Sequence, residues 1–367
     1  MKIVFVGGHL TPAIATIEAI QELRKDVEVH FFGRKHAMEG DKTISHEYQI
    51  ISARKLLFYN IVSGRLQRKF TKYTIWSLLK IPVGLVQAGY LLIKIRPDVI
   101  VTYGGYLAVP VAIAGWVLRI PIVTHEQTII PGLANKIIAR FADRIALTFP
   151  ESEKNYAGNG IDKQKILVTG NPIRKSIYYY GEVSKKMLPT LFVTCGNQGS
   201  HFVNELIFRN LNRLLSFCEI VHQTGKNSLV DDYADSLRMK ESLPEDCRSR
   251  YTPMVYVQEN EIGKIYAEAS VVLSRGGVNT LIELVALKKR GIIIPGHDEQ
   301  LANGQFLEKI GLGVCLRPQS LRDEDFIDCL QSLFMQDEVE LAVEWRDLYE
   351  SAERKLAGII LEYSKKH

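Results

Sequence analysis

The chain has 367 residues, of which 46% are apolar and 24% charged, and its formal net charge is +5 at pH 7. This composition predicts a soluble globular protein with room for about two domains. The five cysteines are scattered and odd in number, which argues against a disulfide framework or a zinc site. No apolar run forms a signal-peptide core or reaches the ~20 residues of a membrane-spanning helix. We therefore expect a cytosolic chain.

Short apolar or β-branched runs alternate with longer helical patterns along the first part of the chain. These runs predict strands at residues 2–6, 27–32, 98–103, 120–126, 143–149 and 165–170. Strands that alternate with helices are typical of a parallel sheet covered by helices.

A second series of strands follows a tyrosine-rich, polar stretch at residues 178–186. It predicts strands at residues 190–195, 218–223, 254–257, 270–274, 291–295 and 313–316. The pattern therefore predicts an α/β protein with two doubly wound, Rossmann-like domains, residues 1–170 and 187–344, which face a cleft between them. A helix at residues 345–367 is expected to pack back on the first domain.

Positive charge is concentrated in one segment. Residues 48–97 contain nine lysines or arginines and no acidic residue, and around Phe70 and Trp76 the basic side chains alternate with apolar ones. An anionic membrane surface attracts and holds such a segment. A core helix with a solvated basic face has the same pattern, and no nucleic-acid-binding motif accompanies the charge.

Both halves of the chain open with a strand, a glycine-bearing turn and a helix. The turns are Gly7-Gly8-His9 and "CGNQGS" at residues 195–200. Backbone N–H groups at the start of such helices bind phosphate, although glycine turns also serve as simple tight connections. Neither turn is a G-x-G-x-x-G fingerprint, so a nicotinamide or flavin enzyme is poorly supported.

A third glycine turn lies in "SRGGVNTLIE", residues 274–283. Gly276 and Gly277 allow a sharp turn and the close approach of a ligand. Glu283 lies in the helix that follows, where a carboxylate accepts two hydrogen bonds from a vicinal diol such as ribose. Thr280 and Glu283 also have the spacing of a capping box, which would give both a structural role.

Polar residues follow several of the predicted strands. They occur in "THEQT" (124–128), "GNPIR" (170–174), "HQTGKN" (222–227) and "HDEQLANG" (297–304). Because open α/β sheets bind ligands at the carboxyl ends of their strands, these motifs predict a ligand in the cleft between the halves.

These motifs and "YGGY" at residues 103–106 occur in the order seen in the bacterial N-acetylglucosaminyltransferases of glycosyltransferase family 28, which make lipid II for peptidoglycan. The chain resembles this family over roughly residues 1 to 315. The resemblance implies a GT-B fold and inverting transfer of N-acetylglucosamine from UDP-N-acetylglucosamine to the undecaprenyl-diphosphate-linked muramoyl pentapeptide. Backbone amides near Gly199 and Ser200 could stabilise the departing diphosphate without a metal ion, and the Asp231-Asp232 pair, in an apparent surface helix, is a poor metal site, so we expect no metal and no cofactor.

The resemblance also implies site residues. In the family, the segment that matches Val278 to Glu283 holds the nucleotide sugar, with Glu283 on the ribose, and the backbone at the position of Val257 meets the uracil. Gln300 matches a contact to the sugar hydroxyls. The other substrate contacts that carry over are Thr128, where the family usually has asparagine, and Arg174, Asn197, Gln198, Asn279 and Thr280.

The first glycine turn departs from the family. The family usually has Gly-Gly-Thr-Gly-Gly-His, and the turn here is about three residues shorter. Gly7 and Gly8 are expected to meet the acceptor, and His9 is a candidate for the general base or for a contact to the acceptor phosphate. A histidine at the end of a strand also serves as a simple turn hydrogen-bonder.

Acceptance of a polyprenyl diphosphate implies work at a membrane. The first domain would take the acceptor and attach peripherally, through residues 65–96, to the cytoplasmic face of the plasma membrane, while the second would bind the UDP-sugar; no nucleic-acid partner is expected. Three alternatives stay open: a related transferase with another lipid or small-molecule acceptor, a UDP-N-acetylglucosamine 2-epimerase of similar fold, and a non-catalytic relative that binds nucleotide sugar.

Overall fold

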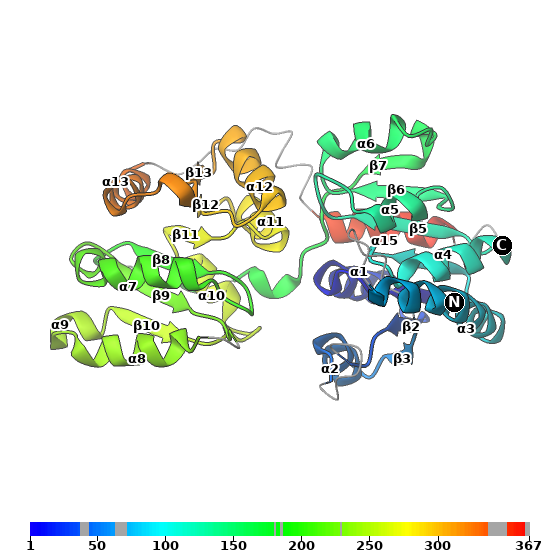
Figure 1. Ribbon diagram of the computed structural model, residues 1–367, viewed down its shortest axis with the longest axis horizontal. Helices are drawn as coiled ribbons and strands as arrows, with labels where there is room; N and C mark the ends of the chain where they lie inside the picture. Colours follow the sequence, from blue (N-terminus) through cyan, green and yellow to red (C-terminus); the bar gives the residue numbers. More distant parts are fainter. Residues whose placement is uncertain are drawn as a thin grey trace. The chain divides into compact units, whose positions relative to one another are not determined.

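Figure 1 shows the computed structural model of the protein, which describes residues 1–36, 44–62, 72–179, 181–183, 186–227, 230–336 and 351–363, without the side chains of residues 46 and 72–81. The chain forms two compact units. The first contains Met1–Arg174 and Ser351–His367, and the second contains Lys175–Glu350.

The first unit is built on a parallel sheet of seven strands in the order β3-β2-β1-β4-β5-β6-β7. The strands are β1 (Lys2–Val6), β2 (Glu28–Gly33), β3 (Leu57–Asn60), β4 (Val99–Thr102), β5 (Ile122–Glu126), β6 (Arg144–Leu147) and β7 (Ile166–Val168). The central strands β4 and β5 are buried along their whole length, as expected of a parallel sheet with both faces covered.

Helices cover both faces of this sheet (Figure 1). They are α1 (Leu10–Leu23), α2 (His46–Ala53), α3 (Lys72–Ile95), α4 (Ala108–Val117), α5 (Leu133–Ile138), α6 (Glu153–Ala157) and α15 (Ala352–Tyr363), with short 3-10 helices η1 (Pro150–Ser152) and η2 (Lys163–Lys165). Alternate residues of β1 point to opposite faces, so Val4 and Val6 pack with α3 and α4, while Ile3 and Phe5 pack with α1 and α15.

The terminal helix α15 joins the core of the first unit although it lies at the far end of the sequence. It packs against α1 and buries Leu356, Ala357 and Ile360 in the same apolar cluster as Ile3 and Phe5. Residues 345–350 and 364–367 of the predicted terminal helix lie outside the described residues.

The second unit is built on a parallel sheet of six strands in the order β10-β9-β8-β11-β12-β13. The strands are β8 (Thr190–Thr194), β9 (Glu219–Gln223), β10 (Tyr251–Met254), β11 (Val271–Ser274), β12 (Arg290–Ile293) and β13 (Gly313–Cys315). The helices are α7 (His201–Leu215), α8 (Asp232–Ser242), α9 (Glu245–Arg248), α10 (Ile262–Glu268), α11 (Val278–Leu287), α12 (Asp298–Lys309) and α13 (Asp323–Phe334), with 3-10 helices η3 (Lys175–Ile177) and η4 (Pro318–Ser320).

The predicted fold class is confirmed, because both units are doubly wound parallel sheets. The strand predicted at residues 254–257 is wrong: β10 spans Tyr251–Met254, and it tolerates Pro253 because it is an edge strand paired only with β9. Strand β3 was not predicted. It also lies at a sheet edge, and its four residues are exposed or half-buried, so it lacks the buried apolar run of the central strands.

Each sheet has one point where the strand order reverses. This switch point lies between β1 and β4 in the first unit and between β8 and β11 in the second. Ligands of open α/β sheets bind outside the carboxyl ends of the strands at such points. The turns that follow these four strands are therefore the places to look for a site.

The basic segment is only partly described. Its residues 63–71 lie outside the described residues, as do the side chains of residues 72–81, so the basic and aromatic pattern around Phe70 and Trp76 has no structural account. Among the helices of the described residues, none combines the length and the apolar character that crossing a membrane requires.

Candidate functional site

The turn after β8 brings the start of α7 to the switch point of the second unit. Gly196 and Gly199 have positive φ angles of 72° and 68°, which favour glycine. A Cβ atom on Gly199 would also lie 2.9 Å from the carbonyl carbon of Thr224, so this turn packs directly on the backbone after β9. The backbone N–H groups of the first turn of α7 have no partner within the helix and suit a phosphate.

Arg275 connects three turns of the second unit. Its Nη1 donates to Oγ of Ser200 at 2.7 Å, and its guanidinium occupies the space where a side chain at Gly296 would lie. Nearby, Nδ2 of Asn303 donates to the carbonyl oxygen of Gly276 at 2.9 Å. The turns after β8, β11 and β12 are thus held together at one edge of the sheet. The sequence reasoning missed Arg275, although it directly precedes the glycine pair of "SRGG".

Glu283 is a buried carboxylate next to these turns. It is 5% exposed, and its Oε2 accepts a hydrogen bond from the hydroxyl of Tyr266 at 2.7 Å. The capping-box alternative is wrong: α11 begins at Val278 with Gly277 as its N-cap, and no side chain caps the helix. Glu283 therefore lies beyond the first turn of α11, where burial of a carboxylate is costly and points to a specific use.

The other predicted donor contacts lie on the same edge of the second unit. Asn197 and Gln198 are exposed in the turn after β8, and the carbonyl oxygen of Asn197 accepts from the backbone N–H of Lys226 at 2.9 Å. Oε1 of Gln300 accepts from the backbone N–H of Gly296 at 2.7 Å. At the start of α11, Val278 is buried, and Asn279 and Thr280 are partly buried.

A pocket of about 820 Å³ opens beside the ends of β9 and β10. Its lining includes Lys226, Tyr233, Val255 and Tyr256. The ring of Tyr256 is well exposed, and an exposed aromatic ring offers a stacking surface to a base. Val257 follows directly in the sequence and is partly buried. Arg174 is apart from this group, as the last residue of the first unit.

In the first unit, two glycine turns meet at the switch point. A Cβ atom on Gly8 would lie 2.6 Å from the carbonyl oxygen of Tyr103, and one on Gly105 would lie 3.4 Å from Cα of Gly8. The turn after β1 and the "YGGY" turn after β4 therefore pack backbone against backbone. The exposed Gly8 and the buried Gly7 lie at this junction.

Two histidines lie near this junction. His9 is the N-cap residue of α1, and its side chain does not cap the helix. His125 is fully buried at the end of β5, with Nε2 3.1 Å from the carbonyl oxygen of Gly170. Burial is the main reason that the pKa of His125 is lowered to about 4; the charge of His9 acts in the same direction, and the hydrogen bond to Gly170 opposes it. His125 is consequently neutral at pH 7 and donates from Nε2.

Glu126 collects four hydrogen bonds in the core of the first unit. Its Oε1 accepts from the backbone N–H of Thr128 at 2.9 Å and from the Thr128 hydroxyl at 2.8 Å, while Oε2 accepts from Nδ2 of Asn135 and from the hydroxyl of Tyr156, both at 2.8 Å. Thr128 is buried and faces Glu126. The sequence reasoning missed Asn135 and Tyr156, which lie 9 and 30 residues from Glu126 in the chain.

Glu47 is a second carboxylate that the sequence reasoning missed. Its carboxyl carbon lies 2.8 Å from the position of a Cβ atom on Gly7, and its Oε2 accepts from the backbone N–H of Arg34 at 2.9 Å. Burial raises the pKa of Glu47. Within the described ranges, no group of three or more histidine, cysteine, aspartate or glutamate side chains is arranged to hold a metal ion.

Two doubly wound units with glycine turns at both switch points define a protein of the GT-B class. The crystal structure of Acinetobacter baumannii MurG superposes with a TM-score of 0.72 at 21% identity and covers 99% of this chain and 100% of that one. The UDP-GlcNAc 2-epimerase of Methanocaldococcus jannaschii has the same fold, with a TM-score of 0.66 at 15% identity, and the match covers 99% of this chain and 100% of that one.

The chain belongs to glycosyltransferase family 28. Residues 6–147 match the N-terminal domain of this family and residues 190–355 match its C-terminal domain. The UDP-N-acetylglucosamine–N-acetylmuramyl-(pentapeptide) pyrophosphoryl-undecaprenol N-acetylglucosamine transferase of Clostridium kluyveri is 30% identical over 378 residues, with 99% of both chains covered.

Proposed function

We propose that the protein transfers N-acetylglucosamine, with inversion, from UDP-N-acetylglucosamine to the muramoyl-pentapeptide diphosphoundecaprenol called lipid I, and so makes lipid II for peptidoglycan. The observation that carries this proposal is the similarity to the transferase of Clostridium kluyveri over 99% of both chains. The second unit would bind the donor and the first unit the acceptor.

The edge of the second unit supports the donor half of the proposal. The amides at the start of α7 would bind the diphosphate and stabilise the charge that develops on the departing UDP. Glu283 would accept hydrogen bonds from the ribose, with Tyr266 fixing its carboxylate at 2.7 Å. The base would enter the pocket beside Tyr256, next to Val257, while Gln300 would contact the sugar and Arg174, Asn197 and Gln198 would complete the site.

The glycine junction of the first unit supports the acceptor half. Gly7 and Gly8 leave room for a ligand close to the backbone, and His9 would take the proton of the acceptor hydroxyl or contact its phosphate. The four hydrogen bonds to Glu126 give Thr128 a positioning role at the end of β5. A rigid end of β5 would hold His125 close to the acceptor.

An apolar stripe on α3 supports attachment to a membrane surface. Val83, Val86, Tyr90 and Ile93 recur every three or four residues, so they share one face of the helix, and all are well exposed. Trp116 is exposed at the end of α4, which packs against α3. This stripe would insert shallowly into the cytoplasmic leaflet, while the basic residues of segment 48–97 attract anionic lipids. High salt is expected to weaken the attachment.

Release of UDP, measured with and without a short-chain lipid I analogue, tests the proposed function. We expect release only when the acceptor is present. A protein that converts UDP-N-acetylglucosamine without any acceptor would be an epimerase or hydrolase, and one that binds the donor without turnover in the presence of the analogue would be a sensor or would use another acceptor.

A further inference from the structure

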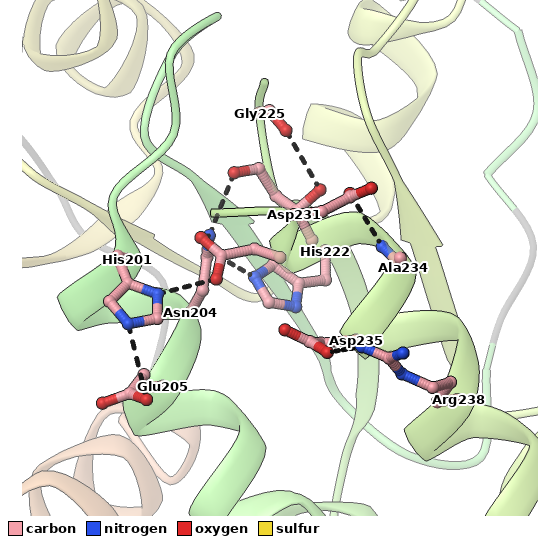
Figure 2. Close-up of polar contacts among 11 residues, drawn as sticks. His201, Asn204, Glu205, His222, Gly225, Asp231, Ala234, Asp235 and Arg238 are labelled. Atoms are coloured by element: carbon pink, nitrogen blue, oxygen red, sulfur yellow. Dashed lines mark hydrogen bonds and ion pairs between the residues drawn. The ribbon is translucent and has the colours of Figure 1, made fainter. Parts of the chain in front are cut away.

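Four buried polar side chains of the second unit form a connected series of hydrogen bonds next to the turn after β8. The hydroxyl of Tyr251 lies 3.0 Å from Nδ1 of His222, and Nε2 of His222 lies 3.0 Å from Oδ1 of Asn204. Nδ2 of Asn204 in turn donates to Oδ2 of Asp232 at 2.7 Å and to the carbonyl oxygen of Thr224 at 3.0 Å. Figure 2 shows His222, Asn204 and His201 in this arrangement.

Each hydrogen bond in this series of side chains has a defined donor and acceptor. Nδ2 of Asn204 faces two oxygen acceptors, so its Oδ1 accepts, and His222 must carry its proton on Nε2. Burial lowers the pKa of His222 to about 3, which keeps the ring neutral and leaves Nδ1 to accept from Tyr251. This series of hydrogen bonds ends at Asp232, whose Oδ2 accepts from Asn204 and whose Oδ1 contacts His201.

The second oxygen of Asp232 holds His201, the first residue of α7. Nδ1 of His201 lies 2.7 Å from Oδ1 of Asp232, and its Nε2 lies 3.5 Å from Oε1 of Glu205 (Figure 2). Asp232 is 3% exposed, so this ion pair is shielded on one side. Most of α8 is exposed or half-buried, and Asp232 and Ser236 are its buried residues.

The remaining charges around His201 come from three helices. A groove of about 520 Å³ between α7 and α8 is also lined by Arg209, Asp235 and Arg238. Arg209 pairs with Asp323 of α13, and Arg238 pairs with Asp235 within α8. The hydrogen bond to Asp232 is the main reason that the pKa of His201 is raised, and the charges of Asp232, Glu205 and Asp235 contribute.

Asp232 lies between the two parts of the proposed donor site. The turn that ends at Ser200 continues directly into His201, while Val230, Asp231 and Tyr233, around the start of α8, line the pocket beside Tyr256. Asp231 caps α8 by accepting from the backbone N–H of Ala234 at 3.1 Å. A displacement of the start of α8 would consequently move the wall of this pocket away from the start of α7.

We propose that Asp232 and His201 are a positioning pair for a nucleoside-diphosphate sugar. Their ion pair fixes the start of α7, which would bind the diphosphate, against the start of α8, which would bind the nucleoside. This inference rests on the donor site of the proposed function. Because the cationic form of His201 makes the pair, donor affinity falls as the pH rises through the pKa of His201, and it is highest below that pKa.

Titration calorimetry of the full chain with UDP-N-acetylglucosamine, between pH 6 and 8.5, tests the pair. This donor is preferred to UDP because a terminal phosphate itself titrates near pH 6. Asp232→Asn should weaken binding about tenfold at pH 6.5, as expected for the loss of one charge-assisted hydrogen bond, and should remove the dependence on pH. His201→Arg keeps a cation at every pH and should bind without a pH step.

Glu205→Gln is the matched control, because Glu205 also faces His201 but has no described bond to Asn204 or α8. We expect it to keep the pH step and nearly all of the affinity. An unchanged step in both Asp232→Asn and His201→Arg would overturn the inference, as would equal effects of Asp232→Asn and Glu205→Gln. His201 is half exposed, so the pH dependence of His201→Arg decides the test alone if Asp232→Asn does not fold. Failure of the wild type to bind any UDP-sugar would instead contradict the donor site itself.

Discussion

At the scale of residues, a buried carboxylate at the edge of the second sheet is held in one orientation. Glu283 is buried and receives the hydroxyl of Tyr266, so its carboxylate has a fixed orientation before a ligand arrives. Preorganisation of this kind avoids the entropy of ordering a flexible side chain on binding. The backbone contacts between Gly8 and the "YGGY" turn fix the edge of the first sheet, where we propose that the acceptor binds, without any side chain.

Glu283→Gln should weaken the binding of UDP-N-acetylglucosamine. Loss of a charged acceptor costs roughly 1.5–3 kcal/mol, or about 10- to 150-fold in affinity. Tyr266→Phe leaves the carboxylate but frees its orientation, so we expect a smaller loss. Calorimetric titration measures both constants; a Tyr266→Phe effect larger than that of Glu283→Gln would speak against a direct role of the carboxylate.

Gly8→Ala should abolish transfer while donor binding persists. The new Cβ atom would lie 2.6 Å from the carbonyl oxygen of Tyr103, so the two turns must separate, at a cost of roughly 1–3 kcal/mol. Gly89→Ala is the control, because among the described residues no atom from outside its own stretch of α3 lies within 4 Å of its Cβ position; it should stabilise the helix by about 0.5–1 kcal/mol. Thermal unfolding and transfer assays compare the two variants.

At the scale of elements, the first turns of helices contribute most of the proposed site. The starts of α7, α8 and α11 all lie at the carboxyl edge of the second sheet, and α1 starts at the equivalent edge of the first. On α3 the two faces of the helix differ: Ala88, Leu92 and Ile95 are buried in the core of the first unit, while the apolar stripe is exposed. Apolar side chains exposed side by side are typical of an interaction surface.

Val86→Glu in α3 should reduce binding to vesicles of phosphatidylglycerol and phosphatidylcholine. Val86 is 73% exposed, so the substitution adds a charge to the inserting face without disturbing the core. Met187→Glu in the second unit is a control at an apolar side chain that is even more exposed. Vesicle sedimentation measures both; equal binding by the wild type and Val86→Glu would contradict the role of the stripe.

The alternation of strands and helices was enough to predict two doubly wound sheets, and the glycine turns were enough to predict the edges that carry the proposed site. The pattern could not predict β3 or the true bounds of β10, because most residues of these two strands are exposed or half-buried and each strand pairs on one side only. Nor could it predict the partners of Glu126 or Asp232, since Tyr156 and His201 lie 30 and 31 residues away in the sequence. Long-range hydrogen bonds of this kind depend on the packing of helices and leave no local pattern.

At the scale of the whole molecule, each sheet contains a histidine that is fully buried and whose pKa is strongly lowered. His125 lies at the end of β5, and His222 lies in β9. Burial lowers their pKa values to about 4 and about 3 respectively. Both rings must take up a proton when the chain unfolds at mildly acidic pH, so both link the stability of their unit to pH.

The free energy of unfolding should therefore fall as the pH drops below the ordinary histidine value of 6.5. Between that value and the lowered pKa, the unfolded chain binds more protons than the folded one, and each pKa unit is worth roughly 1.4 kcal/mol. We expect His222→Gln to lose less stability than the wild type between pH 7.5 and pH 5, as measured by thermal unfolding. A parallel decline in both proteins would show that His222 contributes nothing to the pH dependence.

The most direct test of the central claim follows the sugar itself. Wild-type protein is mixed with labelled UDP-N-acetylglucosamine and a short-chain lipid I analogue, and the lipid product is identified by mass spectrometry beside Glu283→Gln. The account predicts a lipid product heavier by one N-acetylglucosamine and a strong reduction of product by the variant. An unmodified lipid after incubation with a preparation that binds the donor tightly would contradict it.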